Sequence, residues 1–261
     1  MVYDSNYHIY KYKANLHFHS KLSDGIYSLK ELLKLINDSE FDIISLTDHN
    51  EINNSVNLFN TEIKEKIIIL GIEISTSDLI EILVYFKDIN EFLDFFDNHI
   101  KTRKKQFWSA YIKINIFELL DEIKNYNVLL GIPHPFGGKG LIRRLYKKGV
   151  SESDILKILQ NFDFCEVFNS TKSKKNNYKA KEWCELNSPN IFKLASSDLH
   201  NIKSSFCMAG TNVFSSHKLN LDNFFSLVKS KKHNDIVFWP YGKSLRRIQI
   251  YYHHVRSFVR F

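Results

Sequence analysis

Short apolar segments of strand length alternate along this chain with longer segments of helical periodicity. Strand-like runs include Ile43–Leu46, Val128–Ile132 and Ile191–Ala195. Between such runs, apolar residues recur at helical spacing, as in Leu29–Ile36, which follows an S-L-K-E capping box that begins at Ser28. This alternation predicts a mostly parallel α/β fold with right-handed crossovers. Because the connections are short, the 261 residues are expected to form a single domain, 1–261.

The remaining elements follow from the same two patterns. Further strands are expected at Leu16–His19, Ile67–Ile74, Glu81–Phe86, Phe164–Phe168 and Gly210–Phe214. Further helices are expected within 88–126 and at Leu141–Lys148, Asp154–Asn161, Lys172–Asn187 and 221–231. The residues up to Lys13 are polar and rich in tyrosine, and the tail over 243–261 is basic and aromatic.

Two histidines at the end of the first expected strand stand two residues apart, in the sequence A-N-L-H-F-H-S. Alternation along a strand points His17 and His19 to the same face, with Phe18 on the other. One such pair is weak support for a metal site, because histidine is also common on half-buried surfaces. The pair gains weight only if other ligand-type residues reach the same place.

Ligand-type side chains do follow most of the other expected strands. They are Asp48, His49, Glu73, His134, Glu166, Asp198 and His200. The carboxyl ends of parallel strands meet at one edge of a sheet or at one mouth of a barrel, where active sites form. Imidazole and carboxylate groups are ligands of Zn²⁺, Mn²⁺ and Fe²⁺. The pattern therefore predicts a divalent metal centre.

Composition limits the other possibilities. The three cysteines are widely spaced and form no C-x-x-C motif, which disfavours a disulfide scaffold or a cysteine zinc site and suits a reducing compartment. No apolar run has the length of a membrane span and the first residues do not resemble a signal peptide, so we expect a cytoplasmic protein without membrane contact. The formal net charge of +7 is compatible with an anionic substrate or partner.

Six motifs in order resemble the PHP (polymerase and histidinol phosphatase) superfamily of metal-dependent phosphoesterases. They are L-H-F-H-S-x-L-S-D-G, L-T-D-H-N, G-I-E-I-S, I-P-H-P, E-V-F-N and S-S-D-L-H, spread over about residues 14–200. The chain is most similar to the small stand-alone members. The resemblance implies a distorted (β/α)7 TIM-like barrel, with a motif-bearing core over about 14–215, that holds two or three divalent ions (Zn, Mn or Fe) at its mouth.

The resemblance also implies a distribution of ligands. One ion would be held by His17, His19, Glu73 and Asp198, and a second by Asp24, His49 and His200. Glu73 would bridge to a third ion, which His134 also binds. Asp48 would orient an imidazole from behind, while Glu166 and Asn169 would lie near the site and organise its loops.

The chain departs from the family pattern in one motif. Many relatives carry a histidine for the third metal in a sequence like V-H-I-L, where this chain reads Ile80-Glu81-Ile82-Leu83. Glu81 is either an oxygen ligand in place of that histidine or an ordinary solvated carboxylate beside a weak or empty third site.

Metal ions at such a site would supply a bridging hydroxide for the hydrolysis of a phosphate ester, so no Ser or Cys nucleophile is needed. Asp198 or His200 is expected to carry a proton to the leaving group. Arg143 and Arg144 are candidates for binding the substrate phosphate, with Lys172, Lys174 and Lys175 as rivals.

We therefore expect a small anionic phosphorylated substrate. Two alternatives remain open at this point, and the oligomeric state is not predicted. One is a nuclease acting on DNA or RNA ends, suggested by the basic aromatic tail, although that tail more readily predicts a terminal helix packed on the barrel with a solvated basic face. The other is a non-catalytic regulatory module built on a metal centre.

Overall fold

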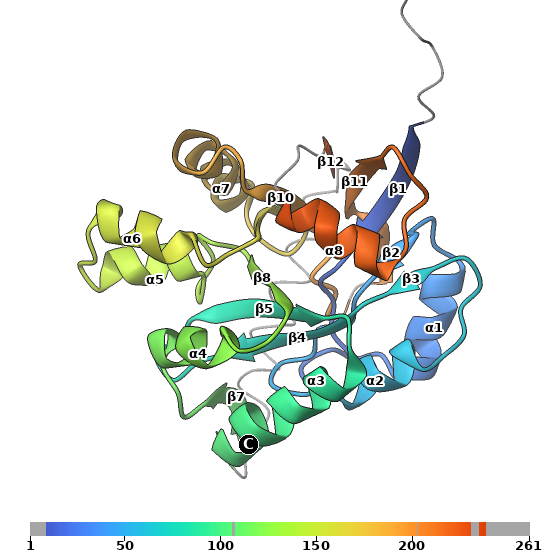
Figure 1. Ribbon diagram of the computed structural model, residues 1–261, viewed down its shortest axis with the longest axis horizontal. Coiled ribbons are helices and arrows are strands. Elements are labelled where there is room, and N and C mark those ends of the chain that lie inside the picture. The colour runs from blue at the N-terminus through green and yellow to red at the C-terminus, as the bar shows by residue number, and fades with distance from the viewer. Residues whose placement is uncertain (1–8, 106–107, 202, 231–234, 239–261) are drawn as a thin grey trace, which may run out of the picture.

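A computed structural model describes residues 9–105, 108–201, 203–230 and 235–238, and Figure 1 shows its mixed α/β architecture. The basic aromatic tail over 243–261 therefore lies outside the described residues. Within these ranges, no helix combines the length and the apolar character needed to cross a membrane.

The first of two five-stranded sheets is built around β1 (Tyr10–Asn15). Its strand order is β12 (Asp235–Phe238), β11 (Ala209–Ser215), β1, β2 (Ile43–Ile44) and β3 (Ile67–Ile68). The strands β1, β2 and β3 are parallel, whereas β11 is antiparallel to both β1 and β12. The segment before Leu16 thus forms a strand of its own, and β1 ends before the histidine pair that was predicted to lie in a strand.

The second sheet contains the longer strands that end at the candidate ligands. Its order is β10 (Phe192–Ser196), β9 (Phe164–Asn169), β8 (Val128–Ile132), β5 (Glu81–Phe86) and β4 (Leu70–Ser75). The strands β8, β9 and β10 are parallel, but β5 is antiparallel to both of its neighbours. The prediction of a mostly parallel sheet is wrong here, because residues 76–80 are too few for a crossover and can only make a hairpin.

The two sheets meet at two corners, but the described strands of one sheet do not pair with those of the other. At one corner, the predicted strand Ile67–Ile74 divides at Ile69, so that β3 pairs in the first sheet and β4 in the second. At the other, the Thr211 hydroxyl of β11 accepts a hydrogen bond from the Ala195 amide (2.8 Å) and donates one to the Ala195 carbonyl (3.0 Å). The described strands thus form two mixed sheets, and the expected closed (β/α)7 barrel is not present in their pairing.

Most helices follow the predicted order along the chain. They are α1 (Leu29–Asn37), α2 (Asn53–Phe59), α3 (Ile89–Phe95), α4 (Ile116–Ile123), α5 (Leu141–Lys147), α6 (Glu152–Leu159), α7 (Lys174–Asn187) and α8 (Leu221–Lys229). The capping box that begins at Ser28 is confirmed, since Ser28 Oγ accepts from the Glu31 amide and Glu31 accepts from the Ser28 amide. The purely helical prediction for 88–126 is wrong in its middle, where the hairpin of β6 (Lys104–Lys105) and β7 (Trp108–Ile112) intervenes.

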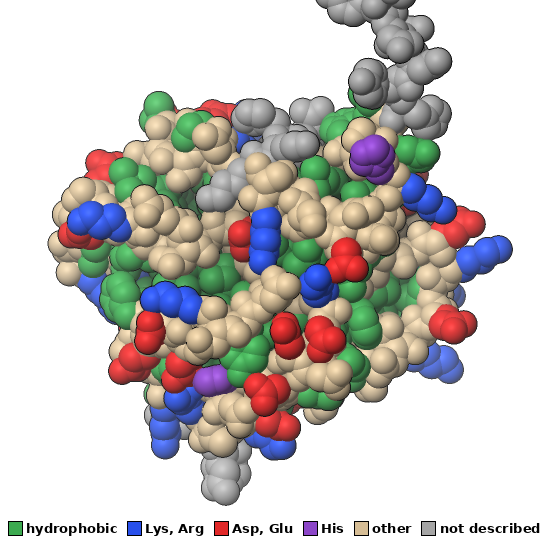
Figure 2. Space-filling view, in the orientation of Figure 1, with side chains coloured by type: hydrophobic (Ala, Val, Ile, Leu, Met, Phe, Trp, Pro, Cys, Tyr) green, Lys and Arg blue, Asp and Glu red, His purple; other side chains and the backbone are tan. Residues whose placement is uncertain are grey.

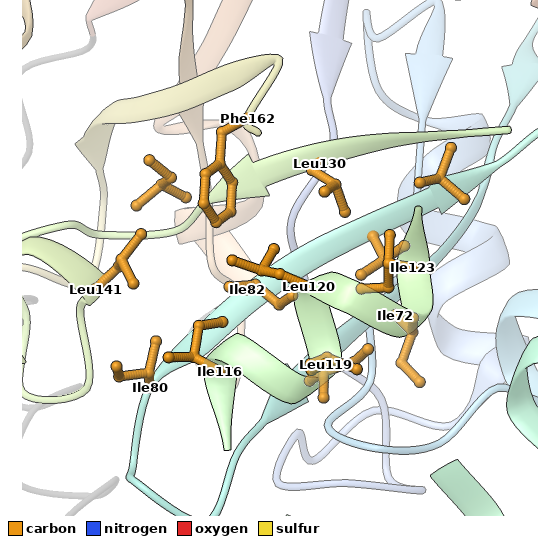
Figure 3. Packing of buried hydrophobic residues seen from close by; sticks show 14 of the residues in the cluster. Ile72, Ile80, Ile82, Ile116, Leu119, Leu120, Ile123, Leu130, Leu141 and Phe162 are labelled. Carbon is orange, nitrogen blue, oxygen red and sulfur yellow. The ribbon is translucent and has the colours of Figure 1, made fainter. Parts of the chain in front are cut away.

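Alternate side chains of β5 pack into two different hydrophobic clusters. Ile82 packs with β4, β8 and the apolar side of α4, as Figure 3 shows for Ile72, Leu119 and Leu130. Leu83 and Tyr85 instead belong to a second cluster that draws side chains from strands of both sheets. The two sheets therefore enclose a common apolar interior, and the polar ends of the strands open at one edge of it.

Charged side chains are interspersed on the face of the molecule shown in Figure 2, where acidic and basic groups neighbour one another. The net positive charge of the chain is therefore not concentrated on that face.

Candidate metal centre

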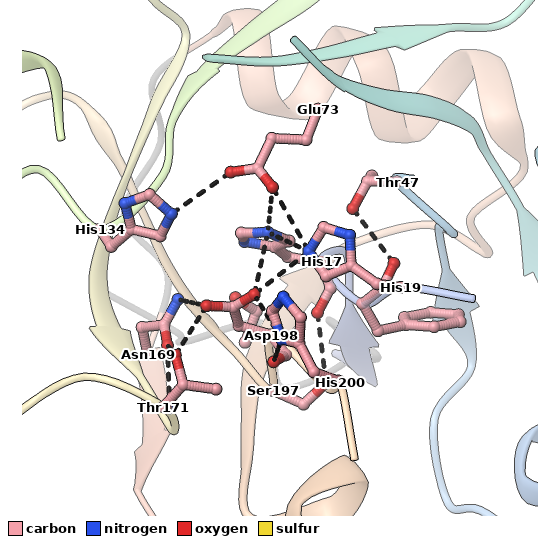
Figure 4. A network of polar contacts seen from close by, with 12 residues as sticks. His17, His19, Thr47, Glu73, His134, Asn169, Thr171, Ser197, Asp198 and His200 are labelled. Carbon is pink, nitrogen blue, oxygen red and sulfur yellow. Dashed lines mark hydrogen bonds and ion pairs between the residues drawn. The ribbon is translucent and has the colours of Figure 1, made fainter. Parts of the chain in front are cut away.

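The candidate ligands converge at the ends of strands from both sheets (Figure 4). His17 and His19 follow β1, His134 follows β8, and Asp198 and His200 follow β10, while Glu73 lies within β4. The antiparallel direction of β5 brings its first residue, Glu81, to the same edge, opposite Ser75.

The backbone at this edge is unusual. Among the described residues, five non-glycine residues have positive φ angles, and three of these are at the site: Asn50 (50°), His134 (30°) and Asp198 (47°). Such conformations cost of order 1–3 kcal/mol each and cluster at functional sites. The fold therefore tolerates strained backbone at these residues, which directs their segments toward the site.

The histidine pair behaves as the alternation predicted, although the regular strand has already ended. The segment stays extended because the His19 amide donates to the Leu199 carbonyl and the Asp198 amide donates to the His17 carbonyl. Both imidazoles are fully buried, with their Nε2 atoms 3.2 Å apart. Phe18 points the other way and packs edge-on against Phe206.

Two carboxylates complete an inner group around this pair. Glu73 Oε2 lies 3.2 Å from His17 Nε2 and 3.3 Å from His19 Nε2. Asp198 Oδ1 lies 3.4 Å and 3.2 Å from the same two nitrogens. The other oxygen of Glu73 lies 3.3 Å from His134 Nε2, so Glu73 joins this group to His134.

An outer group surrounds Asp24, which lies in the loop between β1 and α1. Asp24 Oδ2 is 3.1 Å from His200 Nε2 and 3.5 Å from His49 Nε2. The His19 ring stands between the two groups, 4.7 Å from the His49 ring and 4.4 Å from the His200 ring. Glu81 approaches from β5, with Oε1 3.7 Å from His49 Nδ1 and Oε2 3.5 Å from His134 Nε2.

Hydrogen bonds set the tautomers of two of these imidazoles. His17 Nδ1 lies 3.1 Å from Glu166 Oε1, and His200 Nδ1 lies 2.7 Å from the Asp198 carbonyl oxygen. Each partner is an acceptor, so Nδ1 carries a proton and Nε2 is the nitrogen that faces the site. Nε2 is therefore the atom of each ring that is placed to bind a metal ion.

Two buried polar atoms also fit a bound cation. His19 Nδ1 and Glu73 Oε1 are inaccessible to water and make no hydrogen bond within the described part of the chain, although they have ion-pair contacts with Asp24 Oδ1 at 3.8 Å and His134 Nε2 at 3.3 Å. A buried polar atom that lacks a hydrogen bond costs about 1–3 kcal/mol, and a metal ion would remove that cost. Four overlapping groups of these His, Asp and Glu residues have their ligand atoms within 4.8 Å of one another. The donor set therefore fits divalent metal ions.

The charges within the site hold the carboxylates ionised. Burial alone would raise the pKa of Asp198, but Lys172, His17 and His200 hold it well below its usual range. Burial likewise opposes ionisation of Asp24, and His200 and His49 outweigh it, so its pKa is also well below normal. Anionic oxygens are thus available to a cation throughout the site.

Glu166 and Asn169 contact the inner group from the side away from its shared centre. Glu166 contacts His17 with one oxygen, which also accepts from Ser196, and accepts from the His134 amide (2.7 Å) with the other. Asn169 Nδ2 donates to Glu166 (2.7 Å) and to Asp198 Oδ2 (3.0 Å).

Asp48 has a different role from the predicted orientation of an imidazole. Its carboxylate accepts from the Ser20 amide and hydroxyl and from the Ser23 hydroxyl, at 2.5–2.6 Å. Asp48 precedes a positive-φ turn and points across to the Ser20–Ser23 loop. It therefore fixes the loop that carries Asp24.

The basic side chains that contact the candidate ligands are lysines, and the two predicted arginines lie further out. Arg143 is exposed on α5, and Arg144 Nε donates to the Gly138 carbonyl (2.8 Å). Lys172, one of the predicted rivals, lies 2.8 Å from Asp198 Oδ2 through its Nζ. The sequence interpretation missed Lys139, whose Nζ is 2.7 Å from Glu81 Oε1.

It also missed Thr171, which donates to Asp198 Oδ2 at 2.7 Å. The position of Lys139 in the loop G-G-K-G, directly after His134, was the available signal. A glycine-rich loop that follows a ligand can fold back toward it. Thr171 had no comparable signal.

A family model described as the PHP domain matches residues 15–211, which is most of the chain. A search of curated proteins finds no match. Among solved structures, the chain is similar to the lesion-specific endonuclease PfuEndoQ of Pyrococcus furiosus, with 16% identity and a TM-score of 0.65. That alignment covers 87% of this chain but only 58% of the endonuclease.

Two further solved structures share the fold. PsfC from Pseudomonas syringae aligns with 14% identity and a TM-score of 0.61, over 95% of this chain and 99% of its own. A two-domain protein from Bacteroides vulgatus containing a predicted PHP-like metal-dependent phosphoesterase aligns with 16% identity and a TM-score of 0.55, over 94% of this chain and 70% of its own. At these identities the likeness concerns the fold.

Proposed function

The chain belongs to the PHP domain family, and we propose that it is a metal-dependent phosphoesterase acting on a small phosphorylated metabolite or nucleotide. The observation that carries this proposal is the meeting of the His17 and His19 Nε2 atoms with one oxygen each of Glu73 and Asp198, where each oxygen lies within 3.4 Å of both nitrogens. Buried imidazoles and carboxylates gathered in this way are suited to hold metal ions.

The inner ion would be held by His17, His19, Glu73 and Asp198, and the outer ion by Asp24, His49 and His200. His134 would bind an ion together with Glu73. Zinc, manganese or iron ions there would lower the pKa of a water molecule toward neutrality and neutralise the phosphate oxygens.

The chain itself orients these groups and supplies the proton for the leaving group. Asn169, Thr171 and Lys172 all donate to Asp198 Oδ2, which fixes that carboxylate and keeps it ionised. Asp198 or His200 remains the proposed carrier of that proton.

Lys172 also supports binding of an anionic substrate, because its ammonium group stands at the inner carboxylates with its side chain 22% exposed. Arg143 and Arg144 stay proposals for contacts with the phosphate, since a guanidinium group can bind two phosphate oxygens at once.

A substrate screen tests the proposal. Nucleotides, sugar phosphates, histidinol phosphate and short oligonucleotides are incubated with Mn²⁺, Zn²⁺ or Fe²⁺ added in turn, and released phosphate or cleaved product is measured. We expect turnover of at least one small phosphate ester that chelation abolishes. Absence of turnover with every ion would contradict the proposal, and less than one bound ion per chain would instead favour a non-catalytic module.

A nuclease acting on DNA or RNA ends is the second candidate. Its support is the shared fold with endonuclease Q, which has been solved in complex with a 27-mer duplex substrate with an abasic lesion at the active site. Salt-sensitive binding of single strands by the full chain, lost on truncation after Tyr241, would favour this candidate. Absence of binding at low salt would remove it.

A further inference from the structure

The Glu81 carboxylate at the edge of the metal centre is already paired with a cation of the chain itself. Lys139 Nζ lies 2.7 Å from Glu81 Oε1, and the Ser75 hydroxyl donates to the same oxygen at 2.8 Å. The Glu81 side chain is 6% exposed and the Lys139 side chain 36%, so the carboxylate of this pair is buried and the lysine partly exposed. Ion pairs in such surroundings are much less screened than those on the surface.

The backbone places this lysine in register with Glu81. The Glu81 amide donates to the Lys139 carbonyl at 3.0 Å, and Glu81 forms an isolated parallel bridge with Gly140. A Cβ atom at Gly140 would lie 2.3 Å from the His134 carbonyl oxygen, so glycine is required where the loop turns back against His134. The loop that follows one candidate ligand therefore delivers an ammonium group to another.

The two lysines of the site engage their carboxylates differently. Lys172 binds Asp198 Oδ2, which leaves Oδ1 directed at the His17 and His19 nitrogens. Lys139 binds Glu81 Oε1, which is the oxygen that lies nearest to His49, at 3.7 Å. Lys172 thus binds the Asp198 oxygen that faces away from the imidazoles, whereas Lys139 binds the Glu81 oxygen that faces His49, within the group of His49, Glu73 and Glu81.

We propose that Lys139 is a built-in counter-ion that keeps a metal ion out of the group formed by His49, Glu73 and Glu81. This inference rests on the proposed metal centre and concerns how many ions it holds. An ammonium group on Glu81 neutralises the carboxylate and repels a divalent cation brought to the same oxygen. The inner group, in which Lys172 binds the Asp198 oxygen that is turned away from the two imidazoles, keeps its ion, as does the outer group.

The number of bound ions tests the inference without any assay of activity. The full chain is stripped with a chelator, loaded with Zn²⁺, freed of excess ion, and analysed by native mass spectrometry and elemental analysis. We expect Lys139→Met to bind one more zinc ion per chain than the wild type. The double variant Lys139→Met/Glu81→Gln should lose that additional ion, because the added ion needs the Glu81 carboxylate.

Lys148→Met is the matched control. It removes one positive charge from the adjoining helix end, where Lys148 pairs with Asp78 at 2.8 Å, and leaves Glu81 untouched. We expect the control to bind the wild-type number of ions. Equal numbers in Lys139→Met and the wild type would overturn the inference, as would an additional ion in the double variant or in the control. Absence of zinc from the wild type would instead contradict the metal centre and with it the proposed function.

Discussion

The inner and outer halves of the candidate metal centre are built in different ways. The inner half has His17 and Asp198 almost fully buried, and Glu166 and Asn169 hold them from behind with direct hydrogen bonds. The outer half has Asp24 27% exposed and His49 14% exposed. Asp24 lies in a loop that Asp48 fixes by binding its serines, with no contact to the imidazoles themselves.

This difference indicates that the inner half is preorganised to bind an ion, whereas the outer half is accessible to substrate. The inner ligands are fixed by two strand-end segments that bond to each other, so little rearrangement is needed to bind an ion. Two of the outer ligands, Asp24 and His49, are partly exposed, so a phosphate substrate can reach them. We therefore expect substitutions in the inner half to affect metal binding more than those in the outer half.

Replacing His17 should have the largest effect. His17→Ala removes a nitrogen that lies within 3.4 Å of both Glu73 and Asp198. We expect hydrolytic activity to fall by well over about 100-fold, since loss of partners that merely support a ligand already costs about 10- to 100-fold. Turnover with Mn²⁺ and metal content by elemental analysis measure the effect.

His49→Ala is the matched variant of the outer half. It should also abolish turnover, yet retain the inner ion, so that metal content separates the two variants. Normal turnover in either variant would contradict the proposed function. Equal loss of metal in both would contradict the division into halves.

The directions of several inner side chains could be predicted from the sequence because they follow from the alternation of side chains along a strand. Alternation in H-x-H fixes the relative direction of His17 and His19 even though β1 ends at Asn15. Glu166 was also placed by its strand, β9. Lys139 could not be placed this way, because its contact depends on a loop that turns back over His134 and on the direction of β5.

The pairing of the strands was predicted less well than their positions. Most expected strands lie close to observed ones, but their pairing depends on contacts distant in sequence. The hairpin from β4 to β5 was in principle predictable from its short connection, whereas the division of Ile67–Ile74 between two sheets was not. Nothing in that apolar run marks Ile69 as the point where the chain changes partners.

Glu166→Gln tests the support of the inner half. The glutamine keeps one acceptor for His17 Nδ1 but turns an NH₂ group toward the His134 amide, which donates to Glu166 Oε2 at 2.7 Å. We expect metal affinity to fall by about 10- to 100-fold. Titration of the stripped protein with Zn²⁺ in the presence of a competing chelator measures this. Unchanged affinity would mean that the inner ligands hold their positions without Glu166.

Asp48→Asn is the corresponding test of the outer half and should have the smaller effect. It replaces an acceptor for three donors, from Ser20 and Ser23, with a group that has one acceptor and one donor end. The Asp24 loop is partly exposed, so water can take over part of the lost bonding. We expect about a tenfold weaker outer ion, the equivalent of about 1.4 kcal/mol, and an unchanged inner ion. Zinc titration that resolves two affinities checks this. A larger loss from the inner ion than from the outer one would show that Asp48 supports both halves, which the direction of its three hydrogen bonds argues against.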